Sequence, residues 1–512
     1  MHDSPQRSPG QTGDGDSVRP TELQRGAVGL FGDFVGAISD VAPTLDVGLT
    51  LAAFVIAVGL AGPSTILITG AAMLCVATGY ARLNRAEPNA AAGVRWLQKI
   101  MPAFGFAMGL LVILTITFIL ISNVSLMGST VLSLFNSSLT GNAFAVWAVG
   151  AAIVFLAVAI AVVGVRVQIR FQAVIVILEY AIVVICAGAI LWAHASGRLS
   201  HAPHPTLSWL SPTSATSSGL SAGIVLGVFT LGGWENPIYL AEEQRNATRD
   251  PGRAAYLGII WGSIFIAFLM FAFQSAAPAS ELQKHAGNVL GYATGLVLPQ
   301  PWPTLIDLAL ISSLIAGIQA TASDGARTAF GMARERILPQ VFGRVNPRYL
   351  TPSASFIIIG IVVVAISGLY AASSGIGTIL ADVTSTAGFL YTIIYVAVAL
   401  ASIWRFRKHV MASVRGFITG AVIPLIGSAV LMYAFVKSLA ASAAGVILPT
   451  VAVLALALAL GFVLQHRRRA PFFQREAAEK SALPGLALGV PDPVRGLGQT
   501  EATDQPKLGE HS

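Results

Sequence analysis

Residues 229–239 read FTLGGWENPIY, and residues 39–44 read SDVAPT. Each stretch interrupts a long apolar segment with residues that break helices. Proline lacks the amide donor and clashes with the preceding turn, and paired glycines weaken a helix further. An acidic residue lies within each stretch, Glu235 in one and Asp40 in the other. The two stretches therefore predict two discontinuous helices that hold polar groups inside an apolar layer.

The composition is that of a membrane protein. Of the 512 residues, 55% are apolar and only 11% are charged, and the mean hydropathy is +0.73. Soluble proteins carry about 25% charged residues. These values exclude an ordinary cytosolic enzyme, a disordered chain and a nucleic-acid binder. Long runs of Ala, Val, Ile and Leu without alternation indicate membrane helices rather than a membrane barrel.

Twelve apolar runs are long enough to cross a bilayer, which takes about 20 residues. We expect them at residues 28–60, 63–82, 101–134, 143–164, 171–193, 219–241, 254–275, 303–326, 353–372, 378–403, 416–436 and 444–464. The first and third runs are too long for one straight helix. We therefore expect one of them to be broken and the other to be tilted.

The distribution of basic residues predicts the orientation. With twelve spans both ends share a side, and of the 31 Lys and Arg residues only Arg198, Lys284 and Lys437 fall on the other side. Because basic loops face the cytoplasm, we expect both ends to be cytoplasmic and the protein to lie in the plasma (cell inner) membrane. The positive net charge of +7 then reflects contact with anionic lipid rather than with nucleic acid.

The chain divides into a membrane region and two tails. Residues 1–27 are polar, without the apolar core or cleavage site of a signal peptide, and predict a cytoplasmic tail. Residues 466–512, of which 481–498 are rich in Pro and Gly, predict a disordered cytoplasmic tail. Between them we expect one repeat of five helices at 28–202, a second at 203–403, and two last helices at 404–465.

The two breaks are five helices apart. Five is odd, so a second unit of five helices begins from the opposite membrane face, as in an inverted repeat. Transporters of that kind place the substrate at breaks in matching positions, where free N–H groups bind a carboxylate and free carbonyls bind an ammonium group or a cation. The first break supplies the candidate substrate residues Ser39, Asp40, Val41, Ala42, Pro43 and Thr44. The alternative is that each proline only kinks its helix.

Three stretches resemble the amino acid–polyamine–organocation (APC) permeases. Residues 229–254, FTLGGWENPIYLAEEQRNATRDPGRA, are similar to the sixth helix and following loop of that family. Residues 327–339, RTAFGMARERILP, and 345–352, VNPRYLTP, are similar to the segment after the eighth helix. YARL at 80–83, followed by EPNA at 87–90, resembles the loop after the second helix. The resemblance runs from about residue 28 to about residue 464.

The resemblance implies an all-α membrane protein of twelve transmembrane helices. These would form the 5+5 inverted repeat of the LeuT type plus two peripheral helices, with helices 1 and 6 unwound around the substrate. The family's helix 6 gate maps onto Phe229, and its unwound substrate segment maps onto Thr230, Leu231, Gly232, Gly233, Trp234 and Glu235. One difference concerns the substrate: residues 39–44 replace a Gly-rich motif that holds the α-carboxylate in amino acid permeases.

Ionisable residues within the spans are the candidates for coupling. Charged groups are costly at mid-bilayer and generally face a cavity. Glu179 lies deep in the fifth span, and either it or Asp40 could exchange a proton as the cavity hydrates. Other interpretations stay open: Glu179 as a neutral residue hydrogen-bonded across helices, and Asp40 and Glu235 as helix caps.

The eighth span carries a candidate gate. Asp324 and Arg327 are three residues apart near its cytoplasmic end, which predicts an ion pair or an inner gate. Thr321 and Ser323 are candidates to coordinate sodium with carbonyls of the first helix. The 8 His residues form no cluster with metal spacing, and there is no nucleophile elbow or P-loop. We therefore expect no metal, no cofactor and no enzyme activity.

The sequence favours a secondary active transporter that imports an amino acid or a related amine with protons, by alternating access. Its partners would be that small molecule, protons or sodium, and the lipid bilayer. A polyamine or organocation carrier, an amino acid exchanger and a sodium-coupled symporter remain alternatives, as does a membrane-embedded enzyme or sensor. The oligomeric state is left open.

Overall fold

The computed structural model describes residues 23–135, 137–373, 376–467 and 472–473. Within these residues the regular structure is helical apart from one isolated bridge between Val28 and Gln244. The α-helices are α1 (Leu30–Val41), α2 (Pro43–Val58), α3 (Gly62–Ala86), α4 (Gly93–Gln98), α5 (Pro102–Phe135), α6 (Ala143–Val162), α7 (Val165–Ala195), α8 (Ser217–Thr230), α9 (Asn236–Tyr239), α10 (Asp250–Phe273), α11 (Ala279–Lys284), α12 (Val289–Gly295), α13 (Trp302–Arg334), α14 (Ser353–Ser373), α15 (Ile376–Arg405), α16 (Arg407–Val410), α17 (Val414–Phe417), α18 (Ile423–Ala441) and α19 (Ala444–Arg467).

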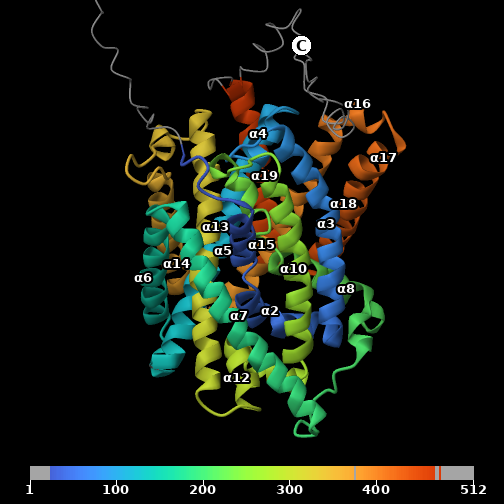
Figure 1. The fold of residues 1–512 in the computed structure, drawn as a ribbon. Helices are drawn as coiled ribbons and strands as arrows, with labels where there is room; N and C mark the ends of the chain where they lie inside the picture. The colour runs from blue at the N-terminus through green and yellow to red at the C-terminus, as the bar shows by residue number, and fades with distance from the viewer. Residues whose placement is uncertain (1–22, 136, 374–375, 468–471, 474–512) are drawn as a thin grey trace, which may run out of the picture. The chain divides into compact units, whose positions relative to one another are not determined.

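Short helical turns complete the described elements. They are η1 (Gly59–Ala61), η2 (Ser137–Leu139), η3 (Leu207–Leu210), η4 (Pro212–Ser214), η5 (Ala241–Glu243), η6 (Ala286–Asn288) and η7 (Gln340–Gly343), together with the π-helical η8 (Ile418–Val422). The long helices run side by side between two ends that carry the loops (Figure 1).

Ten helical stretches within the described residues are long and apolar enough to cross a membrane. One of them, Leu30–Ala86, covers nearly all of the first two predicted spans, and the shorter helix Ser217–Thr230 overlaps the first half of the sixth. The exact number of twelve stays a prediction. The eighth predicted span continues as α13 to Arg334, beyond the expected limit of 326. In these last turns Arg327 pairs with Glu243 and Arg334 pairs with Glu242.

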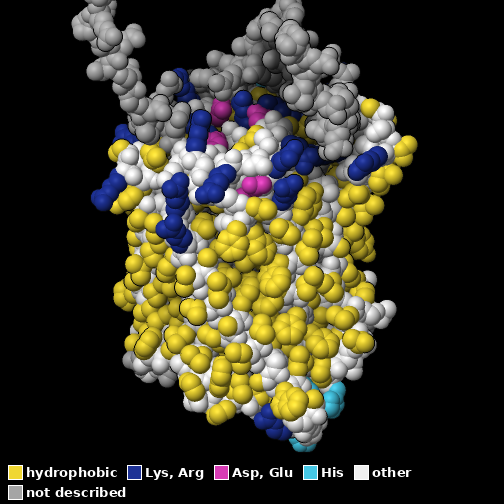
Figure 2. Space-filling model, viewed as in Figure 1, with side chains coloured by type: hydrophobic (Ala, Val, Ile, Leu, Met, Phe, Trp, Pro, Cys, Tyr) yellow, Lys and Arg dark blue, Asp and Glu magenta, His cyan; other side chains and the backbone are white. Residues whose placement is uncertain are grey.

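The surface between the two ends is apolar. Hydrophobic side chains cover the middle of the face in Figure 2, whereas Lys and Arg gather at its upper end. Large apolar side chains point outward from the outer helices, such as Phe144 on α6, Ile177 on α7 and Leu448 on α19, which are 66–70% exposed. Exposed apolar area of this extent marks a surface that contacts another apolar phase, here the acyl chains of lipid.

The interior is formed by the helices that position the site. The third predicted run forms one continuous helix, α5, which packs against α13 and α15. Helix α3 packs against α10, and α1 packs against α10 and α13. Helix α8 packs against α2, α3, α15 and α18, and α9 packs against α1, α10 and α13, so each of the two interrupted helices contacts several other helices at its break.

Candidate functional site

The first helix is interrupted at a single residue. Ala42 has φ 39° and ψ 64°, in the left-handed region, between the end of α1 and the start of α2. Asp40 stays in the last turn of α1, and Pro43 begins α2. The prediction of a break across all of residues 39–44 was therefore too wide. Pro43 takes the first position of a new helix, where its missing N–H has no intrahelical partner to lose.

The sixth helix is interrupted over five residues. Helix α8 ends at Thr230, α9 begins at Asn236, and residues 231–235 between them form turns. Gly233 has φ +94°, a conformation that L side chains rarely adopt. The break lies where the Gly-Gly and Asn-Pro pairs indicated it.

The two breaks are in direct contact. A Cβ atom added to Gly233 would lie 2.7 Å from Cγ of Asp40 and 2.8 Å from its carbonyl carbon. Position 233 thus requires glycine for two reasons: its φ angle is one that other residues rarely adopt, and Asp40 occupies the space that a side chain would need. This contact joins the acidic residue of the first break to the backbone of the second.

A small cavity lies beside this contact. Its volume is about 30 Å³, and its lining residues come from α1, α2, α5, α8, α13 and α15 and the second break: Asp40, Leu45, Asp46, Ile119, Asn123, Phe229, Gly232, Gly317, Thr321 and Tyr391. A water molecule needs about 10–15 Å³ of such space, so the cavity has room for about two waters. An amino acid is larger. Entry of a substrate requires the lining side chains, Phe229 and Tyr391 among them, to move.

Three of the predicted substrate residues line the cavity: Asp40, Phe229 and Gly232. The others lie around it without lining it. Ser39, Val41, Ala42, Pro43, Thr44, Thr230 and Leu231 are buried, and Thr230 donates a hydrogen bond to the Leu226 carbonyl.

Trp234 and Glu235 lie on another side of the second break. The Trp234 ring packs against Tyr80, with ring centroids 4.9 Å apart, and against Tyr395 at 5.3 Å. Oε2 of Glu235 accepts hydrogen bonds from the Tyr395 hydroxyl at 2.9 Å and from the Gly233 N–H at 3.2 Å. Glu235 therefore accepts from a backbone N–H within the break, whereas its side chain makes no cap hydrogen bond to α9.

A hydrogen-bond network joins both breaks to α13. The Thr321 hydroxyl donates to Oδ1 of Asp40 at 2.6 Å, and Nδ2 of Asn236 donates to Oδ1 of Asp324 at 2.6 Å. The acidic residue of the first break is thus held by α13, and α13 in turn holds the start of α9 after the second break.

Glu179 lies outside the cavity but is connected to the first break. Its Oε1 accepts a hydrogen bond of 2.9 Å from Ser313, and the Ser313 hydroxyl accepts one of 3.3 Å from the Leu45 N–H. Leu45 lines the cavity. Glu179 is therefore connected to the cavity by two hydrogen bonds, through Ser313 and Leu45, and can influence the site without contacting a substrate.

The predicted ion pair between Asp324 and Arg327 was wrong. Nε of Arg327 lies 2.6 Å from Oε2 of Glu243 in η5, and both side chains are almost fully buried. The Arg327 guanidinium also donates to Ser323. Arg327 pairs with Glu243 because the chain after the second break passes next to α13, while Asp324 is held by Asn236 of the same segment.

Several residues at the site were absent from the sequence prediction: Asp46, Asn123, Asn236 and Tyr391. Asp46 carried a signal, since it is a further acidic residue in the first span, six positions after Asp40. Asn236 lies within the quoted helix 6 stretch. Asn123 stands among the serines Ser122 and Ser125 and Tyr391 is followed by Thr392, so neither is singled out by its neighbours, and only the packing of α5 and α15 brings them to the cavity.

The fold and this site define a multi-pass membrane permease with two broken helices. The family model for amino acid permeases matches residues 29–462, and the chain belongs to that family. In a comparison of structures, the crystal structure of MhsT in complex with L-phenylalanine aligns with a TM-score of 0.59 at 14% identity, covering 81% of this chain and 99% of MhsT. This likeness shows the LeuT-type fold.

Two curated relatives are similar over part of the chain. The low-affinity putrescine importer PlaP of Escherichia coli (strain K12) is 24% identical over 295 residues, which is 56% of this chain and 63% of PlaP. The glutamate/serine transporter AimA of Bacillus subtilis (strain 168) is 26% identical over 326 residues, 57% of each chain. In each case the match spans less than two thirds of the relative's own length.

Proposed function

We propose that this protein is a secondary transporter that moves an amino acid or a related amine across the plasma membrane, coupled to protons, with both ends in the cytoplasm. The observation that carries the proposal is the cavity between the two broken helices, where Asp40 and Asp46 lie together. No Lys, Arg or His is among its described lining residues. An enzyme activity is not proposed, since the similar proteins are named as importers and transporters.

The acidic lining favours recognition of an ammonium group. A buried carboxylate without a basic partner is costly, and a bound cation offsets that cost. Donors for a substrate carboxylate are fewer at the first break, because Pro43 has no N–H and the Leu45 N–H is used by Ser313. The amine is therefore the group that this site would recognise first.

The buried carboxyl groups of the cavity support proton coupling. With no basic residue among the described lining residues, a proton on Asp40 or Asp46 would neutralise part of the negative charge when the site is empty of other cations. A substrate ammonium that binds Asp40 competes with that proton, so binding of the two is linked, and a proton gradient can bias the alternating-access equilibrium. Glu179, reached through Ser313, is the second candidate for a proton position.

Sodium coupling has weaker support from the geometry. The two hydroxyls that were candidates for a sodium ion are engaged elsewhere, since Thr321 donates to Asp40 and Ser323 contacts Arg327. Both would have to exchange partners before they coordinated an ion.

The contacts at the arginine-rich end would form the inner gate. The Ala27 and Val28 N–H groups donate to the Glu243 carbonyl, and the Glu243 side chain pairs with Arg327. Phe229 would close the site within the membrane. Opening toward the cytoplasm would require these contacts of Glu243 to separate.

A polyamine carrier is the second candidate. Asp40 and Asp46 line one cavity, and two carboxylates suit a substrate with two ammonium groups. Competition between putrescine and a neutral amino acid for uptake would separate the two candidates, because only the diamine uses both carboxylates.

Uptake into proteoliposomes tests the proposal. Labelled leucine, glutamate, serine and putrescine would be offered under a pH gradient, alkaline inside and without sodium, and separately under a sodium gradient. We expect accumulation of at least one compound with the pH gradient alone. Accumulation that needs sodium and ignores pH would contradict proton coupling, and no accumulation of any amine would contradict the function.

A further inference from the structure

A second, larger cavity lies at the arginine-rich end of the molecule. Its volume is about 280 Å³, and it is lined by the segment before α1 with the start of that helix, by the start of α7 and by the chain after η5: Ala27, Val28, Gly29, Gly32, Arg166, Ile169, Arg170 and Arg245. It is separate from the site described above, with which it shares no lining residue.

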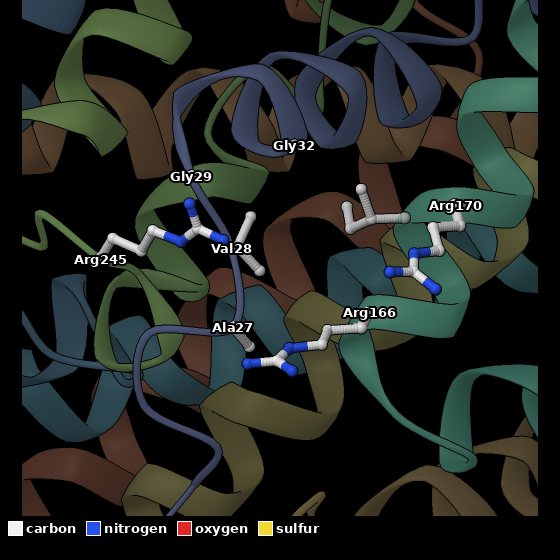
Figure 3. Close-up of a pocket in the computed structure, with 8 residues that line it drawn as sticks. Ala27, Val28, Gly29, Gly32, Arg166, Arg170 and Arg245 are labelled. Atoms are coloured by element: carbon white, nitrogen blue, oxygen red, sulfur yellow. The ribbon is translucent and has the colours of Figure 1, made fainter.

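Three arginines converge on this cavity. Figure 3 shows the side chains of Arg166 and Arg170 extending from α7, and that of Arg245 from the other side, toward the segment that carries Val28 and Gly29. No Asp or Glu is among the described lining residues. Within the described part of the chain, none of the three guanidinium groups forms an ion pair with a carboxylate. Three positive charges thus lie around one cavity whose described lining supplies no counter-charge.

The start of α1 adds hydrogen-bond donors. Gly29, which lines the cavity, is the N-cap of α1, and no side chain caps the helix there. The N–H groups of a first helical turn have no intrahelical acceptors and favour an anion, as the helix dipole does. Gly32 lets the helix approach α7 closely, since a Cβ there would lie 2.9 Å from Val28 and 3.3 Å from Ile169.

We propose that this cavity binds a phosphate group. Arginine presents a planar array of donors that matches phosphate, and three arginines with a helix N-terminus supply charge and donors together. The volume is many times the roughly 10–15 Å³ of such space that one water needs, so a tetrahedral anion fits with some of its hydration. Lys and Arg side chains gather where the apolar surface ends (Figure 2). The phosphate can therefore come from the headgroup of an anionic lipid or from phosphate in solution.

A phosphate here would tie three elements together: α1, α7 and the chain after η5. Val28 already pairs with that chain, since the Arg245 N–H donates to its carbonyl at 2.9 Å. If the protein transports by alternating access as proposed above, the anion would hold α1 against α7 and slow inward opening. This consequence depends on the proposed function, whereas the binding itself does not.

The binding test uses the full chain and two probes. Inorganic phosphate is titrated against thermal unfolding in a neutral detergent, with potassium chloride at equal ionic strength as the control. Phosphatidylglycerol retention is measured by mass spectrometry against phosphatidylcholine. We expect a saturable stabilisation by phosphate, selective retention of phosphatidylglycerol, or both. An effect of phosphatidylglycerol alone assigns the site to the lipid headgroup, and an effect of inorganic phosphate alone assigns it to a soluble phosphate.

Arginine variants test whether the response to phosphate or phosphatidylglycerol arises at this cavity. The double substitution Arg166→Gln, Arg170→Gln should weaken the apparent affinity by roughly tenfold or more, given the energy of charge-assisted hydrogen bonds. Arg344→Gln, an exposed arginine outside the cavity, should leave it unchanged. The proposal is overturned if neither probe distinguishes the double variant from the wild type.

A substitution at Gly29 tests the site without removing an arginine. Gly29 has extended backbone angles, φ −120° and ψ 176°, and a Cβ there meets only the Arg245 side chain at 3.7 Å. Gly29→Asp places a carboxylate among the arginines, whereas Gly29→Asn has nearly the same shape, and both are good N-caps. We expect Gly29→Asp to remove the response to phosphate and Gly29→Asn to keep it. A response in Gly29→Asp equal to that of the wild type would contradict the proposal.

Discussion

The Thr321 hydroxyl donates a hydrogen bond of 2.6 Å to Oδ1 of Asp40, which joins α13 to the last turn of α1 at the edge of the cavity. The bond holds the carboxylate on the cavity side of the first break. When the charge around Asp40 changes, the Thr321 hydroxyl must therefore adjust its hydrogen bond.

Removing the Thr321 hydroxyl should weaken substrate binding. Thr321→Val keeps the side-chain shape but not the donor, and loss of a hydrogen bond to a charged group costs about 1.5–3 kcal/mol. We expect KM for uptake to rise by roughly tenfold or more. Thr321→Ser retains the hydroxyl and should stay within a few-fold of the wild type. Equal KM values for Thr321→Val and Thr321→Ser would show that this bond has no role.

Substitution of Gly233 should disable the contact between the breaks. Gly233→Ala introduces a methyl group that would lie 2.7 Å from Cγ of Asp40, at a position with φ +94°. Backbone strain of this kind costs about 1–3 kcal/mol, and the displaced Asp40 should abolish uptake. Gly188→Ala on α7 is the matched control, because a Cβ at Gly188 meets no atom within 4 Å. Thermal unfolding and uptake are measured on both, and normal uptake by Gly233→Ala would contradict the assignment of the contact.

Removing one partner of the buried Arg327–Glu243 pair should destabilise the protein more than removing both. Glu243→Gln leaves the guanidinium of Arg327 buried without its counter-charge, at a cost of about 3–5 kcal/mol. The double variant Arg327→Met, Glu243→Leu removes both charges and should recover part of the loss. A double-mutant cycle by thermal unfolding in detergent measures this. Additive losses would show that the two groups do not interact.

Acid should weaken a network at the arginine-rich end. Glu87 lies 2.6 Å from Nζ of Lys99 and 2.8 Å from a guanidinium nitrogen of Arg405. Burial raises the pKa of Glu87, but the hydrogen bonds and charges of Lys99 and Arg405 outweigh burial and leave the pKa below its usual range. Because the folded-state pKa is the lower one, the stabilisation is complete at neutral pH and is lost as the pH falls through it.

The variant Glu87→Gln tests the direction of this pH dependence of stability. At pH 7 the variant should unfold more easily than the wild type by about 1 kcal/mol, the upper value for a partly exposed ion pair. The difference should shrink as the pH falls below the usual range for Glu, about 4.3. Thermal unfolding across this pH range provides the measurement, and a difference that grows toward acid would show that the sign is wrong.

The sequence predicted the two breaks because their signals are local. The Gly-Gly and Asn-Pro pairs at 232–237 and the proline at 43 disturb a helix wherever they occur. The exact site of the first break, Ala42, was not predictable, since alanine favours helix and rarely adopts the left-handed conformation that it has here.

The partners of the site residues could not be predicted, because they come from distant parts of the chain. Arg327 and Asp324 have the spacing of an ion pair on one helix, but Glu243 and Asn236 compete for them from the segment after the second break. Glu179 meets Ser313 across 134 positions in the sequence. Such contacts depend on how α7, α13 and the second break pack together, which no local pattern specifies.

Direct binding to purified protein tests the central claim, that the cavity between the breaks holds an amine on Asp40. Isothermal titration of putrescine and leucine would compare the wild type with Asp40→Asn and with Asp307→Asn, a control carboxyl on α13 that does not line the cavity. The account predicts that binding of at least one compound is present in the wild type, is retained in Asp307→Asn and is lost in Asp40→Asn. Binding by Asp40→Asn with the affinity of the wild type would contradict it.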